Sequence, residues 1–383
     1  MNIVQKLSSR ERGSKRSSIM YPDIIHKTVL KMDFRGSLNH EEAEAAQQIN
    51  CIAFSPTGGF LVSGSYFLTL WDMCSYKKET ILPKTQLSMT DQSSMTQVTV
   101  MTYERKILFS LSNGEVFVAH VDSNGESGIT KLGSHLEAVS GLIRNISNPD
   151  EGYSCGDDGF INHFDIRERD YNSLLKCYRF DNNPSRKLKL NGILQNPDNP
   201  QCITVCGDDA YIRVYDLRWL KGSDCLTDVY LPHDLVDRSS ACIKGIAYSN
   251  MGQLLASCNN QKIYMFEQEM GLGPPPIPLP LHINAFPLQL SEAQVYQGHT
   301  VNNQRGRHDI TFFGPKDEYI ASGSACGRIF FWNKREPHRV GSTESHLHSI
   351  SCMTRHPRSQ TPILATSGED QHVRFWASKL LIG

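Results

Sequence analysis

The sequence predicts an all-β fold, a seven-bladed β-propeller preceded by a short helical or disordered segment. An internal repeat is the main observation behind this prediction. The segments Phe164-Asp165-Ile166-Arg167 and Tyr215-Asp216-Leu217-Arg218 are nearly alike and lie 51 residues apart. Each follows a run of Cys-Gly-Asp-Asp, and apolar and polar residues alternate within each unit, as in half-buried strands. A repeat of this length is typical of four-stranded blades arranged radially.

Taken in order, the units share a small-residue strand, a tight turn and a closing strand. The first unit combines residues 49–54, 61–65 and 68–72, and the second, weaker unit closes at 116–120 without an aromatic residue. The closing strands of the first and of the last five units end in aromatic residues, namely Trp71, Phe164, Tyr215, Phe266, Trp332 and Trp376. We expect Trp332 and Trp376 to be largely buried, because their neighbours alternate between apolar and polar residues.

One interval between the closing aromatics is longer than the rest. The closing positions recur at roughly 45 to 51 residues, near the period of a four-stranded blade, but Phe266 and Trp332 are 66 residues apart. This interval contains the proline-rich run 271–280. Proline cannot donate a hydrogen bond to a β-ladder, so the run is predicted to be an insertion between strands. Its PxxP-like stretch 275–278 could alternatively form a polyproline ligand.

The ends of the chain are predicted to meet in one blade. Seven residues follow Trp376, too few for a further strand and its turn, whereas residues 24–34 before the first unit have a strand-like pattern. We therefore expect residues 24–34 to supply the outer strand of the last blade, which removes an exposed edge. The predicted organisation is a tail or short helix at 1–20, the propeller at 21–378 and a tail at 379–383.

Composition limits the class of protein. The chain of 383 residues has 39 basic and 40 acidic residues and a net charge of −1, so bulk charge predicts no nucleic-acid partner. The eleven cysteines lack a disulfide spacing, and several lie in predicted core strands (Cys51, Cys202, Cys206 and Cys352). No signal peptide or membrane span of about 20 apolar residues is recognisable. These features favour an intracellular protein of the nucleus or cytoplasm.

The units resemble WD40 repeats. A Gly-His element is present at Gly298-His299, and the terminal Trp-Asp pair at Trp71-Asp72. The stretch from Tyr296 to Trp332 is similar to one subgroup, the WD-repeat substrate receptors of cullin-4 RING ubiquitin ligases, especially the type-8, type-5 and type-6 associated factors. Two departures from the WD40 pattern, Tyr66 and Ala325, stand where an acidic residue is usual. They predict a weaker side-chain hydrogen-bond network in blades one and six.

The resemblance gives the Asp-x-Arg segments a role. In this family the motif docks on the ligase adaptor, damage-specific DNA-binding protein 1, which implies that Arg167 and Arg218 contact the adaptor. Asp165 and Asp216 would orient the arginines or their turns. Arginine suits the task, because its planar guanidinium is a rigid fork of donors and is enriched at interface hot spots. Alternatively, each arginine forms only a local salt bridge, and the chain is a chromatin or signalling scaffold without a ligase role.

The N-terminus has the pattern of a short helix. Asn2 is a suitable N-cap and Gly13 a suitable stop, and Ile3, Val4 and Leu7 share one face. The resemblance implies that such a helix inserts into the adaptor, as an amphipathic segment docks in a groove. A disordered tail is the alternative, because isolated helices this short are marginal. The basic residues around Lys15 could be a nuclear import patch or a solvated tail.

Motifs for catalysis and for metal binding are absent from the sequence. It has no Walker loop, no Gly-x-Ser-x-Gly and no zinc-ligand pair. His346, His348 and His356 lie near one another in sequence but have no Cys or carboxylate at ligand spacing, and are expected to be loop histidines. The sequence therefore predicts no enzyme activity, cofactor or metal, and a function in protein binding.

Overall fold

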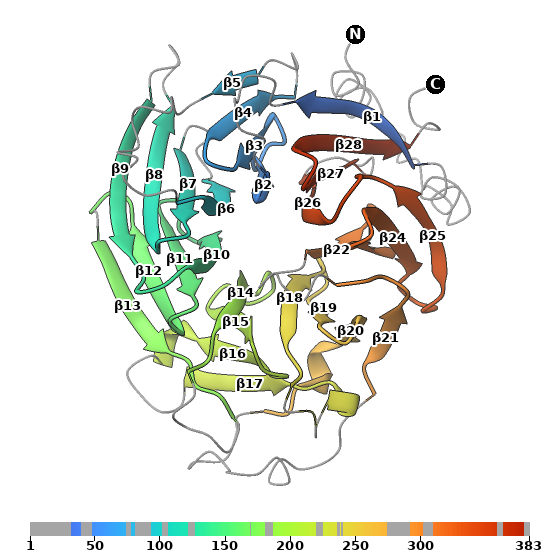
Figure 1. The fold of residues 1–383 in the computed structure, drawn as a ribbon. Coiled ribbons are helices and arrows are strands. Elements are labelled where there is room, and N and C mark those ends of the chain that lie inside the picture. Colours follow the sequence, from blue (N-terminus) through green and yellow to red (C-terminus); the bar gives the residue numbers. More distant parts are fainter. Residues whose placement is uncertain are drawn as a thin grey trace, which may run out of the picture. The chain divides into compact units, whose positions relative to one another are not determined.

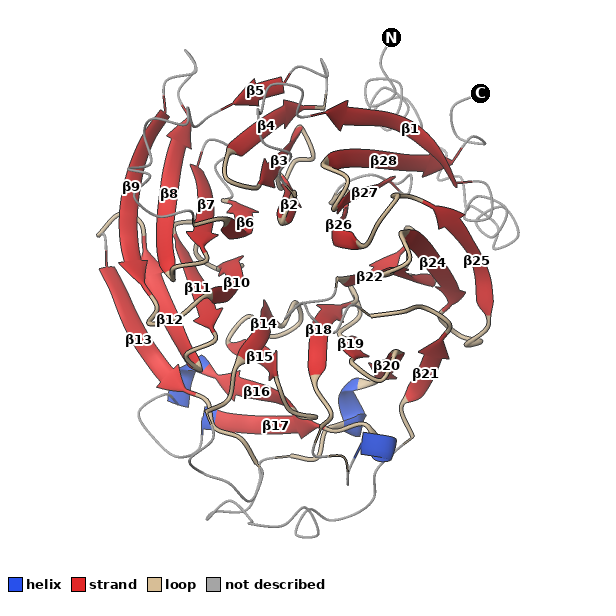
Figure 2. Ribbon diagram, viewed as in Figure 1, coloured by secondary structure: helices blue, strands red, loops and turns tan. Residues whose placement is uncertain are grey.

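The computed structural model shows seven four-stranded antiparallel sheets, the blades of a seven-bladed β-propeller (Figure 1). The predicted all-β fold class is therefore confirmed. Strands make up almost all of the described secondary structure, together with the 3-10 helices η1 (Leu217–Trp219), η3 (His233–Leu235) and η4 (Gln268–Met270) (Figure 2). The structure describes residues 32–39, 48–73, 78–80, 93–101, 106–121, 127–168, 170–180, 187–219, 225–235, 238, 240–273, 292–301, 309–357 and 363–378.

Close contacts divide the chain into two compact units. Except for Ile310, the first unit contains three whole blades. The first of these consists of β2 (Cys51–Phe54), β3 (Phe60–Gly64), β4 (Leu68–Asp72) and β5 (Lys78–Thr80). The second consists of β22 (Ile310–Phe313), β23 (Tyr319–Gly323), β24 (Arg328–Asn333) and β25 (Arg339–Glu344), and the third of β26 (Ile350–Arg355), β27 (Ile363–Gly368), β28 (His372–Ser378) and β1 (Met32–Asn39). We number these blades one, six and seven.

The second unit contains blades three, four and five. Their strands are β10 (Val139–Arg144), β11 (Glu151–Gly156), β12 (Phe160–Asp165) and β13 (Asp170–Lys176); β14 (Leu190–Gln195), β15 (Cys202–Gly207), β16 (Ile212–Asp216) and β17 (Leu226–Tyr230); and β18 (Ile243–Tyr248), β19 (Leu254–Cys258), β20 (Lys262–Phe266) and β21 (Gln294–Gln297). Blade two, whose residues are divided between the units, consists of β6 (Met95–Val100), β7 (Lys106–Leu111), β8 (Glu115–Val121) and β9 (Ser127–Ser134).

Blade seven joins the two ends of the chain. β1 pairs antiparallel with β28, with Phe34 opposite Trp376 and Leu38 opposite Val373. The predicted pairing of an N-terminal strand with the last blade is thus confirmed for residues 32–34, and the strand continues beyond the predicted end to Asn39. Residues 24–31 lie outside the described part of the chain. Pairing with β28, rather than the intrinsic strand propensity of the residues, decides which residues of the N-terminal segment form β1.

The closing aromatics pack into the blade cores as predicted. Trp332 and Trp376 are buried, and so are Phe164, Tyr215 and Phe266 at the ends of the equivalent strands. The four cysteines placed in core strands (Cys51, Cys202, Cys206 and Cys352) are buried too, and no disulfide bond joins cysteines within the described residues. The proline-rich run falls between β20 and β21, within one blade, and all but its first three residues lie outside the described ranges.

Buried polar chains hold individual blades together. Trp376 donates its indole N–H to Thr366 Oγ1 at 2.9 Å, and Thr366 Oγ1 lies 2.9 Å from His346 Nε2. His346 Nδ1 lies 2.7 Å from Asp370. Burial lowers the pKa of His346 to about 4, so the imidazole is neutral at pH 7. His346 lies in the loop between β25 and β26, as the sequence predicts. Its side chain is nevertheless buried, because it is hydrogen-bonded to Thr366 and Asp370.

Blade one keeps part of such a chain despite Tyr66. Trp71 donates its indole N–H to Ser63 Oγ at 2.8 Å. In blade four, the buried guanidinium of Arg213 donates to both oxygens of Asp209, at 3.0 and 2.5 Å. Blade seven has an equivalent pair, in which Arg374 donates to Asp370 at 2.6 Å. The Arg213 guanidinium also lies 4.3 Å from the ring centroid of Phe180. Such a pair is tolerated in a core because each charge has its partner and further hydrogen bonds.

Truncation of a closing aromatic should measure the energy of this packing. We expect Trp376→Ala to lower the free energy of unfolding by about 3–5 kcal/mol, because it removes a large buried side chain and leaves a cavity. Trp376→Phe keeps most of the volume and loses the bond to Thr366, so it should cost less, about 1 kcal/mol for that bond. Denaturant unfolding measures both. Equal destabilisation by the two variants would show that the hydrogen bond, and not the packing of the ring, stabilises this position.

Candidate protein-docking surface

The two Asp-x-Arg segments occupy equivalent places in blades three and four. Asp165 is the last residue of β12 and Asp216 the last residue of β16, and each strand is the third of its blade. The chain leaves both strands into a turn held by the preceding loop of the same blade. Ile166 donates its backbone N–H to the Asp150 carbonyl at 3.0 Å, and Leu217 donates to the Gln201 carbonyl at 2.8 Å. In each blade, the motif therefore lies where the third strand ends, next to the turn that connects the first and second strands.

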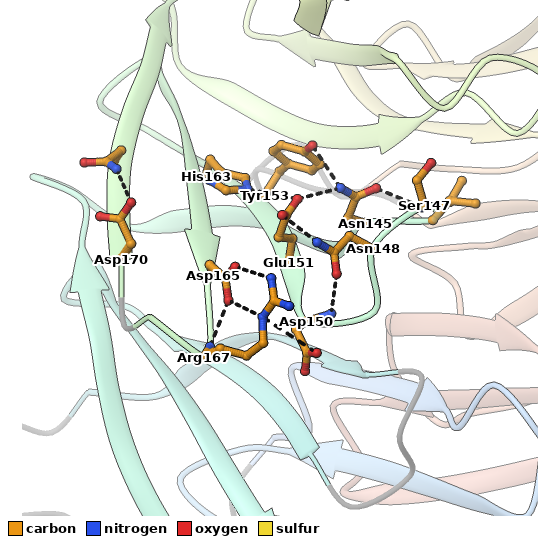
Figure 3. A network of polar contacts seen from close by, with 12 residues as sticks. Asn145, Ser147, Asn148, Asp150, Glu151, Tyr153, His163, Asp165, Arg167 and Asp170 are labelled. Carbon is orange, nitrogen blue, oxygen red and sulfur yellow. Dashed lines mark hydrogen bonds and ion pairs between the residues drawn. The ribbon is translucent and has the colours of Figure 1, made fainter.

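The Asp165 side chain holds Arg167 in place by accepting hydrogen bonds from both its backbone and its guanidinium group (Figure 3). The Asp165 carboxylate accepts the Arg167 backbone N–H at 2.8 Å, Nε–H at 3.2 Å and Nη2–H at 2.8 Å. Asp150 adds a longer ion pair, with its Oδ2 3.9 Å from Arg167 Nε. The Arg167 side chain is 55% exposed, whereas that of Asp165 is 11% exposed. The carboxylate thus lies beneath a guanidinium that faces solvent.

Arg218 repeats this arrangement on the next blade. Asp216 accepts the Arg218 backbone N–H at 2.9 Å, Nε–H at 3.0 Å and Nη2–H at 2.6 Å. The side chain of Arg218 is 60% exposed and that of Asp216 is 5% exposed. The local salt bridge that the scaffold interpretation expects is present in both motifs. Arginine has five N–H donors, however, and within the described residues Nη1 of either arginine makes no hydrogen bond to the chain.

The electrostatics keep both pairs charged. Hydrogen bonds from Arg167 lower the pKa of the Asp165 carboxyl to about 2, and those from Arg218 lower the pKa of Asp216. The same bonds raise the pKa of each arginine. Water screens such exposed pairs, so they contribute little to folding stability. Their main physical effect is to hold each guanidinium in one orientation.

A second layer of polar contacts supports the first motif (Figure 3). Glu151, which follows Asp150, accepts hydrogen bonds from Asn148 Nδ2 at 2.6 Å and Asn145 Nδ2 at 3.0 Å, and lies 3.3 Å from His163 Nε2. These contacts tie the turn between β10 and β11 to β12. They limit the conformations open to the turn that carries Asp150.

The two motifs share one edge of adjacent blades. Gln195, the last residue of β14 in blade four, accepts the Ile146 backbone N–H at 2.7 Å through Oε1 and donates to Asn145 Oδ1 at 3.0 Å. Asn145 and Ile146 directly follow β10 of blade three. The C-terminal ends of β10 and β14 therefore lie next to each other. Arg167 and Arg218 thus lie on the same edge of the two blades, as the repeat predicts. We call Asp150, Asp165, Arg167, Asp216 and Arg218 the Asp–Arg surface.

Other predicted site residues are not placed by the structure. Ile3, Val4 and Leu7, with the whole segment 1–20, lie outside the described residues, so the predicted docking helix stays a prediction. Within the described ranges, no group of three or more His, Cys, Asp or Glu side chains is arranged to hold a metal ion. No helix in those ranges is long and apolar enough to span a membrane.

Sequence reasoning missed several residues around the Asp–Arg surface. Gln195 gives no local signal, because its role depends on a partner about 50 positions away. The exposed Ile146 and Trp219 were also missed. Trp219 directly follows Arg218, and an aromatic residue immediately after the motif could have drawn attention to it.

Comparison with known proteins supports a repeat architecture. The family described as "WD domain, G-beta repeat" matches residues 36–72 and 338–377. Residues of the chain are 34% identical over 83 positions to DDB1- and CUL4-associated factor 6 of Homo sapiens, and equally to that of Mus musculus, covering 22% of this chain and 9% of the relative. WD and tetratricopeptide repeats protein 1 of Homo sapiens is 36% identical over 81 residues, which is 21% of this chain and 12% of the relative.

The matched stretch is thus only about a tenth of the length of these relatives. The chain thus folds as a seven-bladed β-propeller, and two of its stretches, residues 36–72 and 338–377, match the WD40 repeat.

Proposed function

We propose that this WD40 propeller is a substrate receptor of a cullin-4 RING ubiquitin ligase, and that it docks on damage-specific DNA-binding protein 1 through the Asp–Arg surface. The observation that carries the proposal is the matched presentation of Arg167 and Arg218. Each guanidinium is exposed, lies at the same edge of adjacent blades, and is held by a carboxylate beneath it. The partial similarity to a protein named as a DDB1- and CUL4-associated factor supports the same interpretation.

Preorganisation makes the Asp–Arg surface suited to binding. A free arginine side chain loses rotamer entropy when a partner immobilises it, at about 0.5–1.5 kcal/mol for a rotamer-rich side chain. Here the Asp carboxylates already restrict Arg167 and Arg218 in the free protein, through Nε and Nη2. Within the described residues, Nη1 of each arginine makes no hydrogen bond, so its N–H groups can donate to carboxylates or carbonyls of a partner. Two such forks on one edge give a partner two fixed points of attachment.

The proposed mechanism is proximity. One edge of the propeller docks on the adaptor, and another surface holds a target protein near the ubiquitin-charged enzyme of the ligase. Tethering turns transfer of ubiquitin into an effectively intramolecular step and raises the local concentration of the target. The receptor itself needs no catalytic group for this role.

A scaffold without a ligase role is the second candidate. One observation favours it: both aspartates satisfy their arginines within the chain, as a purely local salt bridge would. The two candidate functions differ in whether they require Arg167 and Arg218. The scaffold function does not depend on the arginines, whereas the receptor function requires both of them for capture of the adaptor.

Recovery of partners by the unaltered protein tests the proposed function. The tagged full chain is expressed in cells, purified at moderate salt, and its partners are identified by mass spectrometry. We expect damage-specific DNA-binding protein 1 and cullin-4 subunits among the recovered proteins. Recovery of a reproducible set of partners that lacks the adaptor would favour the scaffold.

The buried carboxylates should matter for binding rather than for folding. In the double variant Asp165→Asn with Asp216→Asn, the amide oxygen can still accept the Arg backbone N–H, but the charge and the second acceptor are lost. We expect about three- to tenfold weaker binding of the adaptor, because each guanidinium loses its charge-assisted bond and its fixed orientation. Titration with purified adaptor measures the affinity, and an unchanged melting temperature verifies the fold. Unchanged affinity would show that the aspartates only shape the turns.

A further inference from the structure

We propose that the adaptor-binding surface extends beyond the Asp–Arg surface to two apolar side chains, Ile146 and Trp219, and that Trp219 inserts into an apolar pocket of the adaptor rimmed by carboxylates. This inference rests on the proposed function and deepens it. It identifies the chemistry of the partner surface: acidic groups for the two guanidinium forks, and an apolar recess between or beside them for an indole ring.

Trp219 is set apart from the other tryptophans. The chain has four tryptophans, and Trp71, Trp332 and Trp376 are buried, whereas Trp219 is 62% exposed. Trp219 is the last residue of η1, which begins directly after β16 and contains Arg218. The ring is therefore presented next to an arginine that Asp216 holds in place. Tryptophan and arginine are the residue types most enriched at interface hot spots, so their adjacency on an exposed edge favours a binding role.

Ile146 lies on the same edge, at the junction of blades three and four. Its side chain is also exposed, while its backbone N–H is bound by the buried side chain of Gln195. Gln195 Nε2 donates in addition to the Pro200 carbonyl at 2.5 Å, in the turn of blade four. The Gln195 side chain thus binds the turns of both blades. The turn of blade four also binds Leu217, the neighbour of Arg218, through the Gln201 carbonyl. Hydrogen bonds thus connect the turn that carries Ile146 to the turn that precedes Trp219.

Charge identifies the occupant. The carboxylates of Asp165 and Asp216 lie beneath the guanidinium groups, so a partner approaching this edge meets the cationic forks first. An acidic rim on the partner complements these forks, and an apolar recess complements the indole. An uncharged, purely apolar partner would leave both guanidiniums without new acceptors.

A fluorine label can test whether Trp219 enters the interface. The full chain is produced with 5-fluorotryptophan and titrated with unlabelled, purified adaptor, so that only this chain is observed. We expect four resonances, of which the one lost in Trp219→Phe is relaxed by a soluble paramagnetic agent in the free protein. On addition of adaptor this resonance should shift and become protected from the agent, while the three buried tryptophans stay protected throughout.

Affinity measurements separate this inference from the proposed function. We expect Trp219→Ala to weaken adaptor binding by at least about tenfold and Ile146→Ala by about two- to fivefold, with unchanged melting temperatures. Leu136→Ala is the matched control, because Leu136 is 85% exposed and precedes β10, whereas Ile146 follows it, at the opposite end. Trp219→Lys provides a second variant that removes the ring but keeps a soluble side chain.

Each outcome has a distinct meaning. Weak binding by both Trp219 variants, with normal binding by Leu136→Ala, supports the inference. If both Trp219 variants bind like the unaltered protein while charge reversal at the arginines abolishes binding, the inference is overturned and the proposed function stands. If the unaltered protein does not bind the adaptor at all, both are overturned.

Discussion

Deletion of residues 1–39 should destabilise blade seven and, with it, the folded chain. The deletion removes β1, which pairs with β28 along almost its whole length, from Met32 opposite Ser378 to Asn39 opposite His372. Several interstrand hydrogen bonds at about 0.5–1.5 kcal/mol each are lost, so we expect the thermal midpoint to fall by roughly 10 °C or more. The deletion also leaves β28 as an unpaired edge, which favours aggregation.

A shorter deletion provides the matched control and locates the strand. Removal of residues 1–31 leaves β1 intact, so its midpoint should stay much closer to that of the full chain. The segment expected from the sequence, 24–34, would instead be largely lost in both deletions. Equal destabilisation by the two deletions would show that residues before Met32 carry the stabilising contacts, and two unchanged midpoints would contradict closure by β1.

Much of the fold could be predicted from the sequence, because each blade repeats the same local pattern. Phe164, Tyr215 and Phe266 close equivalent strands and are buried as expected, since alternation along a strand fixes which side chains face the core. The position of β1 could not be predicted in this way. It depends on pairing with a strand more than 300 residues away, which local propensity does not encode.

The candidate site was only partly visible in the sequence. The repeat placed Arg167 and Arg218 on one edge, since residues at equivalent positions of successive blades face the same way. Only the structure shows that the Asp165 and Asp216 carboxylates are buried beneath the guanidinium groups, and that Gln195 hydrogen-bonds to the turn of blade three. The burial of the Arg213–Asp209 pair in blade four also emerged from the structure, in which the guanidinium lies near the rings of Phe180 and Tyr211.

Charge reversal at both arginines should abolish capture of the adaptor without unfolding the propeller. In Arg167→Glu with Arg218→Glu, each new carboxylate faces its neighbouring aspartate and repels the acidic groups expected on the adaptor. The fold should persist, because both side chains are exposed and belong to no core cluster. Each single reversal should weaken binding less than the double change does, since the two arginines attach to one partner surface.

A third arginine supplies the control for a non-specific effect of charge. Arg328 in blade six is 48% exposed and pairs with Glu344 at 2.6 Å, but it begins its strand instead of following the third strand of a blade. Arg328→Glu therefore changes the net charge as one single reversal does, in a comparable local environment. We expect this variant to bind the adaptor like the unaltered protein, and all variants to keep their melting temperature within a few degrees.

Co-purification of damage-specific DNA-binding protein 1 with the full chain and with the double variant tests the central claim most directly. We expect the unaltered chain and Arg328→Glu to recover the adaptor, and the folded Arg167→Glu, Arg218→Glu variant to lose it. Recovery of the adaptor by the double variant at the level of the unaltered protein would contradict docking through the Asp–Arg surface.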